Sequence, residues 1–112
     1  FSSIMRSINH PSIQVNFDIG NSAALGYDPT EELTALSPYL GSVHVKDRML
    51  GGKSVPLGDG NADFATCFKL IRKAGFKRHF VLQAARGKDG DEIELAIHNR
   101  EFVEQQLSDQ EK

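Results

Sequence analysis

Three short apolar runs in this chain each end in a polar side chain that could bind a metal ion or exchange hydrogen bonds. The runs cover residues 15–18, 43–47 and 80–83. The polar residues of interest are Asp18, His44 and Gln83. A carboxylate and a neutral imidazole are common ligands of divalent metals. Each run precedes a loop and a helix-like segment, so we expect the three side chains at the carboxyl ends of neighbouring parallel strands, where α/β sheets bind ligands.

Each of these residues also has an ordinary structural interpretation. Asp18 precedes a glycine-containing loop, where an aspartate often caps a turn by accepting hydrogen bonds from loop amides. His44 alternates with two valines and so faces away from them, either as a ligand or as the commoner hydrogen-bonded core histidine. Gln83 is a poorer ligand for a divalent metal than a glutamate would be. Both interpretations stay open for Asp18 and His44. Asp47, three residues after His44, could orient a loop or act as an outer partner that supports a metal ligand.

Charged residues follow the second and third runs. Lys46, Arg48 and Lys53 surround the start of a glycine-rich loop at 47–60 and could hold a phosphate or a sugar hydroxyl. For any one of them, a solvated surface charge is the simpler interpretation. Arg86 could contact an anionic group, and a loop as long as 47–60 is often functional in a compact domain.

The elements that position these residues alternate between helix and strand. Apolar periodicity and capping residues predict helices at 2–9, 28–37, 63–74 and 91–107, strands at 13–18, 42–46 and 80–84, and a loop at 18–22. Alternation of this kind predicts a parallel α/β sheet. Such a sheet needs helices on both faces or a barrel into which it can close.

Composition limits the class of protein. The 112 residues form one domain at most, with a formal charge of −2 and 39% apolar residues. No basic excess indicates nucleic acid, and no apolar stretch is long enough to span a bilayer. The single cysteine, Cys67, lies in an apolar helical pattern and is expected to be buried. These features suggest a cytoplasmic protein.

The segments DIGNSAALGYDP, VHVKDR, VPLGDGNADF and FVLQAARG occur in this order. Together they resemble the xylose-isomerase-like sugar-phosphate isomerase/epimerase superfamily, and most of all its L-ribulose-5-phosphate 3-epimerase and hexulose-6-phosphate isomerase-like group. The resemblance covers residues 15–87 and implies a (β/α)8 TIM barrel, which needs ~250 residues. Residues 1–112 would then be a single partial domain: one helix, then the last three βα units of an incomplete barrel.

The resemblance implies a divalent metal bound by Glu, Asp, His and Glu. Asp18 and His44 match the Asp and the His, and Gln83 stands where the last Glu is expected. The first Glu is expected upstream of Phe1. A full-length parent would bind Mn, Mg, Co or Zn, whereas this chain alone could bind none. The residues expected to contact the substrate are Asn21, Lys46, Asp47, Arg48 and Arg86.

In such enzymes two glutamates exchange protons with a sugar through a metal-stabilised enediolate. Gln83 cannot take up a proton, so enzyme activity is left open and this chain alone is expected to be inactive. The alternative is a non-catalytic fragment or a sugar-binding relative. The expected partner is a small sugar or sugar phosphate, with no nucleic acid and no membrane, and exposed strand edges allow a homo-oligomer. The related endonuclease IV fits less well, because Asn21 replaces a histidine and the net charge is negative.

Overall fold

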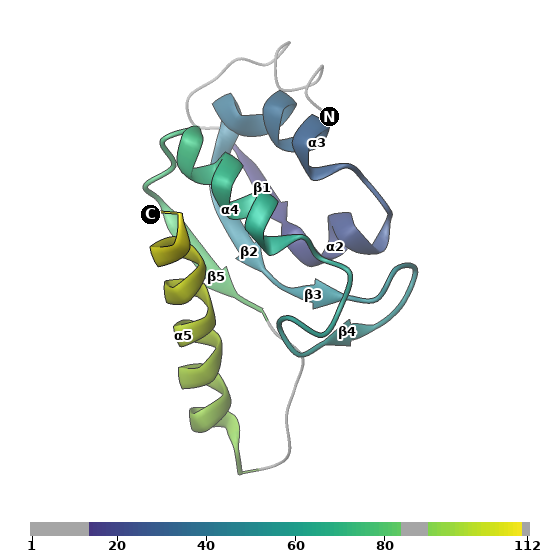
Figure 1. Cartoon of the computed structure of the whole chain (residues 1–112), viewed down its shortest axis with the longest axis vertical. Coiled ribbons are helices and arrows are strands. Elements are labelled where there is room, and N and C mark those ends of the chain that lie inside the picture. The colour runs from purple at the N-terminus through teal and green to yellow at the C-terminus, as the bar shows by residue number, and fades with distance from the viewer. Residues whose placement is uncertain (1–13, 84–89, 111–112) are drawn as a thin grey trace.

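The computed structural model describes residues 14–83 and 90–110 (Figure 1). Strands β1 (Val15–Asp18), β2 (Leu40–Val45) and β5 (His79–Leu82) alternate with helices α2 (Ile19–Ala24), α3 (Pro29–Leu36), α4 (Phe64–Lys73) and α5 (Glu92–Asp109). A 3-10 turn η1 (Ser37–Tyr39) and two short strands, β3 (Asp47–Arg48) and β4 (Ser54–Val55), complete the description. The helix predicted at 2–9 and the residue Arg86 lie outside the described residues.

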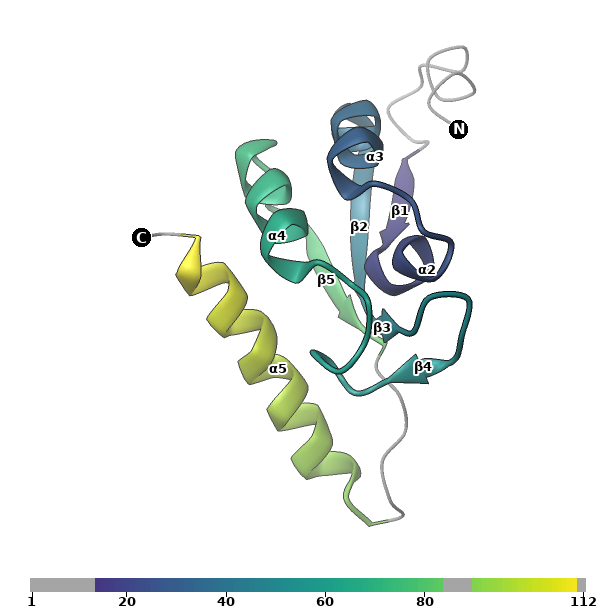
Figure 2. The same cartoon turned by 45° about the vertical axis from the view of Figure 1, so that its right-hand side comes forward.

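The three longer strands form a parallel sheet in the order β1-β2-β5, which is also their order along the chain. Helices α3 and α4 lie over one face of this sheet, and α5 runs beside α4 (Figures 1 and 2). Val43 and Val45 point to that face and are fully buried, whereas Ser42 and His44 point to the other face and are only partly buried. The predicted parallel α/β sheet of an incomplete barrel is confirmed.

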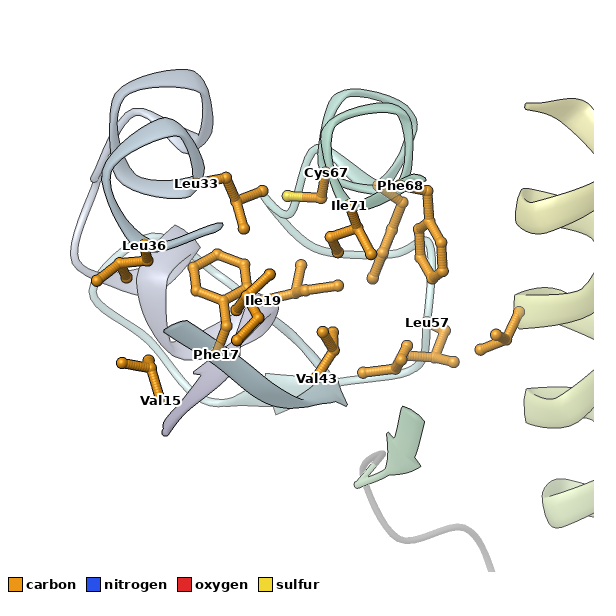
Figure 3. Close-up of a cluster of buried hydrophobic side chains, with 14 residues drawn as sticks. Val15, Phe17, Ile19, Leu33, Leu36, Val43, Leu57, Cys67, Phe68 and Ile71 are labelled. Carbon is orange, nitrogen blue, oxygen red and sulfur yellow. The ribbon is translucent and has the colours of Figure 1, made fainter. Parts of the chain in front are cut away.

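The hydrophobic core lies between the sheet and its covering helices (Figure 3). Four side chains of α4 recur at helical spacing and are all buried, as the sequence predicted. They are Phe64, Cys67, Phe68 and Ile71. Full burial of a large apolar side chain stabilises a fold by about 1.5–3 kcal/mol. This stripe therefore fixes α4 to the sheet.

The loop predicted at 18–22 is wrong, because residues 19–24 form the short helix α2. Asp18 caps this helix by accepting a hydrogen bond from the backbone N–H of Asn21 at 2.8 Å. Gly20 lies against the end of β2, where a Cβ atom would come within 2.8 Å of the backbone carbonyl of Lys46. Capping and close packing together compensate for a glycine in the first turn, which ordinarily disfavours a helix.

Other boundaries differ by a few residues. Helix α3 begins as predicted, with Asp28 accepting a hydrogen bond from the backbone N–H of Thr30 and Pro29 in the first turn. Strand β2 begins at Leu40, two residues early, because η1 turns the chain back toward the sheet. Strand β5 ends at Leu82, and Gln83 follows it with its backbone N–H still bonded to Val45 at 3.0 Å.

Helix α5 carries the predicted apolar stripe, but only part of it is covered. Val103 is buried near the carboxyl half of the helix, whereas Ile93 is 77% exposed and Ile97 is 43% exposed. The amino half of α5 projects past the sheet (Figure 2). None of the helices described, α5 included, is long and apolar enough to cross a membrane.

Candidate functional site

Asp18 and His44 lie side by side at the carboxyl ends of two neighbouring parallel strands. Their Cα atoms are register partners in the β1–β2 pair, and the preceding partners, Phe17 and Val43, are buried toward the helices. Because side chains alternate along a strand, Asp18 and His44 point to the opposite, open face. We call this surface the open face and the other one the helix-covered face. The prediction that the two residues lie at the same end of neighbouring parallel strands is confirmed.

Gln83 contacts His44 on the same face. The Nδ1 atom of His44 lies 2.9 Å from Oε1 of Gln83. In the tautomer that carries its proton on Nδ1, His44 donates this hydrogen bond and leaves the Nε2 lone pair for a ligand. Partners of this kind orient histidine ligands in metal sites. Gln83 therefore lies where it can fix the orientation of His44.

Asp18 has one of the two roles that its sequence context allowed, that of a helix cap, and the other stays a prediction. Its Oδ1 atom caps α2 through the Asn21 amide, so the ordinary interpretation as a capping residue is confirmed. A carboxylate has two oxygens and can accept several hydrogen bonds or bind a cation with the second. Asp18 is only partly buried. Capping therefore leaves its Oδ2 atom available to a ligand.

The described residues do not form a complete metal site by themselves. Within 14–83 and 90–110, no three or more His, Cys, Asp and Glu side chains are grouped so that they could hold a metal ion. Asp18 and His44 offer one carboxylate oxygen and one imidazole nitrogen, which is the donor chemistry that divalent cations accept. These two residues fit a cation that takes its remaining ligands from elsewhere.

Asp47 was expected to contact the substrate, but its side chain is not exposed to one. It is fully buried, and its Oδ1 atom accepts hydrogen bonds from the backbone N–H groups of Arg48 and Ala62. Its Oδ2 atom accepts two more, from Gly58 and Gly60, both at 2.9 Å. The carboxylate thus holds both ends of the long loop together, and we leave Asp47 out of the binding site proposed below.

The sequence allowed Asp47 to orient a loop but did not identify the backbone groups that it holds. The available signal was an aspartate directly after a buried strand, with Gly58 and Gly60 a short distance along the chain. At Gly60 a Cβ atom would collide with the Asp47 carboxylate. Gly60 therefore reflects close approach of the loop backbone to a buried carboxylate.

Arg48 bridges the long loop and α2. Its Nη1 atom donates to Oδ1 of Asn21 at 3.0 Å, and its Nε and Nη2 atoms both donate to the carbonyl of Gly52. Three of the five guanidinium N–H groups are thus used within the protein. Lys46 is partly buried at the end of β2, next in sequence to the strand that carries His44. Arg86 lies outside the described residues.

Cys67 is buried, which confirms its predicted place in the core. Burial raises the pKa of its thiol to about 12, and the charges of Asp63 and Glu32 contribute in the same direction. A thiol with so high a pKa is protonated at neutral pH. Cys67 is therefore unsuited to act as a nucleophile.

A cavity of about 200 Å³ lies on the helix-covered side of the sheet. Phe17, Ile19 and Cys67 belong to its lining, together with Tyr27 and Leu50. Its lining does not include Asp18, His44 or Gln83, so it is separate from the site on the open face.

Comparison with known proteins identifies the family. The family model of the xylose isomerase-like TIM barrel matches residues 1–106. The chain belongs to this family. Among curated relatives, the L-ribulose-5-phosphate 3-epimerase UlaE of Shigella boydii is 30% identical over 102 residues, which are 90% of this chain and 36% of that protein.

Solved structures of the family have the same fold. A xylose isomerase domain protein from Alicyclobacillus acidocaldarius aligns with a TM-score of 0.78 at 16% identity, over 98% of this chain and 42% of that one. A xylose isomerase-like TIM barrel protein from Mycobacterium smegmatis, in complex with magnesium, aligns with a TM-score of 0.69 at 21% identity. The alignment covers 96% of this chain and 38% of that one. The chain thus spans well under half the length of these relatives.

Proposed function

We propose that the chain is the C-terminal part of a metal-dependent sugar or sugar-phosphate isomerase or epimerase, with Asp18 and His44 as two of the cation's ligands. One observation carries the proposal. A carboxylate and an imidazole lie in register on adjacent parallel strands, on the open face and at the carboxyl ends. A divalent cation bound there would stabilise the negative charge that develops on sugar oxygens when a proton leaves the carbon next to a carbonyl.

The relatives support this proposal. A curated relative of 30% identity is an L-ribulose-5-phosphate 3-epimerase, and one structural neighbour was solved in complex with magnesium. An oxygen and a nitrogen donor suit Mn²⁺, Mg²⁺, Co²⁺ or Zn²⁺. The remaining ligands would come from the part of the barrel that the relatives have in addition to the segment matched here.

The protein's own residues would divide the work at this site. Gln83 holds His44 by a hydrogen bond and could turn to bind a cation weakly or donate to a sugar hydroxyl. Because an amide takes up no proton at neutral pH, the proton-transferring groups would lie elsewhere in the protein. Lys46, at the end of β2, and Arg86 would attract the anionic group of a sugar phosphate. Such a sugar would be the small-molecule partner of a cytoplasmic enzyme.

The second candidate is a sugar-binding protein without catalysis. It is favoured by Gln83, which stands where the family's last glutamate is expected and which satisfies His44 without any cation. In this case the outer strands β1 and β5 would remain edges of the three-stranded sheet and could pair with a second copy.

Titration with Mn²⁺ tests the metal site. In isothermal titration calorimetry of a full-length protein that contains this chain, we expect one Mn²⁺ site. Asp18→Asn and His44→Ala should weaken the affinity at least about tenfold, the effect of losing even an outer partner of a metal ligand. Asp28→Asn is the matched control, since Asp28 caps α3 in the way Asp18 caps α2 and asparagine is an equally good cap.

Activity provides the second readout. With Mn²⁺ present, a full-length protein containing this chain should exchange the proton next to the carbonyl of a ketopentose 5-phosphate with solvent deuterium, and the same two variants should lose that exchange. Binding of Mn²⁺ that both variants leave unchanged would overturn the metal site. Binding without exchange would favour the sugar-binding protein.

A further inference from the structure

Arg48 connects the long loop to the first turn of α2 through hydrogen bonds on both sides. Its guanidinium donates to the carbonyl of Gly52 through Nε at 3.0 Å and Nη2 at 2.8 Å, and to Oδ1 of Asn21 through Nη1 at 3.0 Å. An arginine that donates in two directions from one rigid plane fixes the separation of the two groups it joins. The loop and α2 are therefore tied together at this point.

Asn21 joins Arg48 to Asp18 through two hydrogen bonds. While its side-chain oxygen accepts from Arg48, its backbone N–H donates to Oδ1 of Asp18 at 2.8 Å. An unbroken series of hydrogen bonds thus runs from Arg48 through Asn21 to the candidate ligand. Arg48 is itself fixed at its backbone, where its N–H donates to buried Asp47 and its carbonyl accepts from the N–H of Asn61 at 2.8 Å.

The opposite side of α2 is held by packing. The absence of a side chain at Gly20 lets the first turn approach the backbone of Lys46, two residues after His44. The backbone N–H of Gly51 adds a hydrogen bond from the long loop to the carbonyl of Ala24 at 2.8 Å. Helix α2 therefore has little freedom to shift relative to the ends of β1 and β2.

We propose that Arg48 and Asn21 are positioning residues, which hold the Asp18 carboxylate so that Oδ1 caps α2 and Oδ2 faces a cation beside His44. The inference rests on the function proposed above. It gives Arg48 a role different from substrate binding, because most of its N–H groups are already committed within the protein. It also couples the conformation of the long loop to the affinity of the site.

Mn²⁺ titration and amide exchange of a full-length protein that contains this chain test this inference. We expect Arg48→Met to weaken Mn²⁺ binding about tenfold, the range seen when an outer partner of a metal ligand is lost. Hydrogen exchange of the Asn21 backbone amide, followed by NMR, should accelerate in the same variant. Lys53→Met is the matched control: Lys53 is an exposed basic residue of the same loop, and this variant should change neither quantity more than about twofold.

A double-variant cycle distinguishes positioning from general loss of structure. Arg48→Met combined with Asn21→Ala should bind Mn²⁺ about as weakly as the weaker single variant, because both act through one hydrogen bond. Additive losses, or an unchanged affinity and Asn21 exchange rate in Arg48→Met, would overturn the inference.

The two proposals can fail separately. If the unmodified full-length protein binds no Mn²⁺, the metal site fails and the positioning role fails with it, even where Asn21 exchange shows that the hydrogen bonds exist. If Mn²⁺ binds and depends on Asp18 and His44 but not on Arg48, the metal site stands and only the positioning role is overturned.

Discussion

The two faces of the three-stranded sheet are built from the same strands and differ in almost every physical property. On the helix-covered face, Phe17, Val43 and Val45 are at most 3% exposed and contact α3 and α4 through apolar packing. On the open face, polar side chains pair across strands. Ser42 donates to Asn16 at 2.8 Å, and His44 contacts Gln83 at 2.9 Å.

This difference separates stability from chemistry within one sheet. In a TIM barrel the helices form the outer ring, so the open face corresponds to the interior side of the barrel. Burial of apolar side chains supplies most of the folding free energy, and exposed polar pairs contribute little. We therefore expect substitutions on the helix-covered face to unfold the chain and substitutions on the open face to alter ligand binding.

The largest effect should come from Phe68. Its ring is fully buried and stacks on Phe80 with 5.5 Å between the ring centroids. Phe68→Ala should lower the free energy of unfolding by about 3–5 kcal/mol in urea titrations followed by circular dichroism. Val81→Ala on the open face, where the side chain is 39% exposed, should cost less than about 1 kcal/mol. Equal losses of unfolding free energy in the two variants would contradict the proposed difference between the two faces of the sheet.

Substitution of Asp47 should give the next largest loss of stability, because its buried carboxylate joins the end of β2 to the long loop. Asp47→Asn keeps one acceptor oxygen and places an amide donor against backbone N–H groups that now bond to the carboxylate. We expect a loss of roughly 2–4 kcal/mol in stability, since each buried donor left unpaired costs roughly 1–3 kcal/mol. Limited proteolysis should then cut within 49–61. The exposed neighbour Asp59 is the control. If Asp59→Asn were as sensitive to proteolysis as Asp47→Asn, the result would argue against anchoring of the loop by Asp47.

The burial of Cys67 on the helix-covered face makes the free energy of unfolding depend on pH. Burial raises the pKa of its thiol from 9.0 to about 12, so above pH 9 the unfolded chain loses this proton before the folded chain does. The unfolded state then binds fewer protons, and the free energy of unfolding must fall as pH rises toward 12. Urea titrations at about pH 8 and about pH 10 should show a smaller fall for Cys67→Ala than for the unmodified chain. An identical fall in both would mean that the thiol is not protected by burial.

The smallest effect should come from the polar pair on the open face. Ser42→Ala removes the donor of the hydrogen bond to Asn16, and both residues have access to water. Water can replace the lost partner, so stability should change by less than about 0.5 kcal/mol. A loss above about 1 kcal/mol in the same urea titration would show that this face is buried in solution, for example by a second copy of the chain.

Alternation along the strands made much of this arrangement predictable. The apolar runs of β1 and β2 placed Asp18 and His44 at the same end of neighbouring strands, and the spacing of Phe64, Cys67 and Ile71 located the buried side of α4. These patterns depend only on the periods of strand and helix. They do not depend on contacts between distant residues, and so they can be read from one sequence.

The remaining features depend on distant contacts. Helix α2 was predicted as a loop because Gly20 disfavours a helix locally, whereas packing against Lys46 favours it. The anchoring role of Asp47 arises from Gly58 and Gly60, which the fold brings back to it. The contact of His44 with Gln83 joins residues 39 positions apart, and only the pairing of β2 with β5 brings them together.

Paramagnetic broadening by Mn²⁺ tests most directly the claim that the open face carries the site. In NMR spectra of a full-length protein that contains this chain, substoichiometric Mn²⁺ should first broaden the amide signals of residues 18–21, 43–46 and 82–83, and should affect those of α4 last. Asp18→Asn should remove this pattern while the spectrum stays dispersed. Broadening that began at exposed acidic groups such as Glu101 and Glu104 on α5, or that was unchanged in Asp18→Asn, would contradict the account.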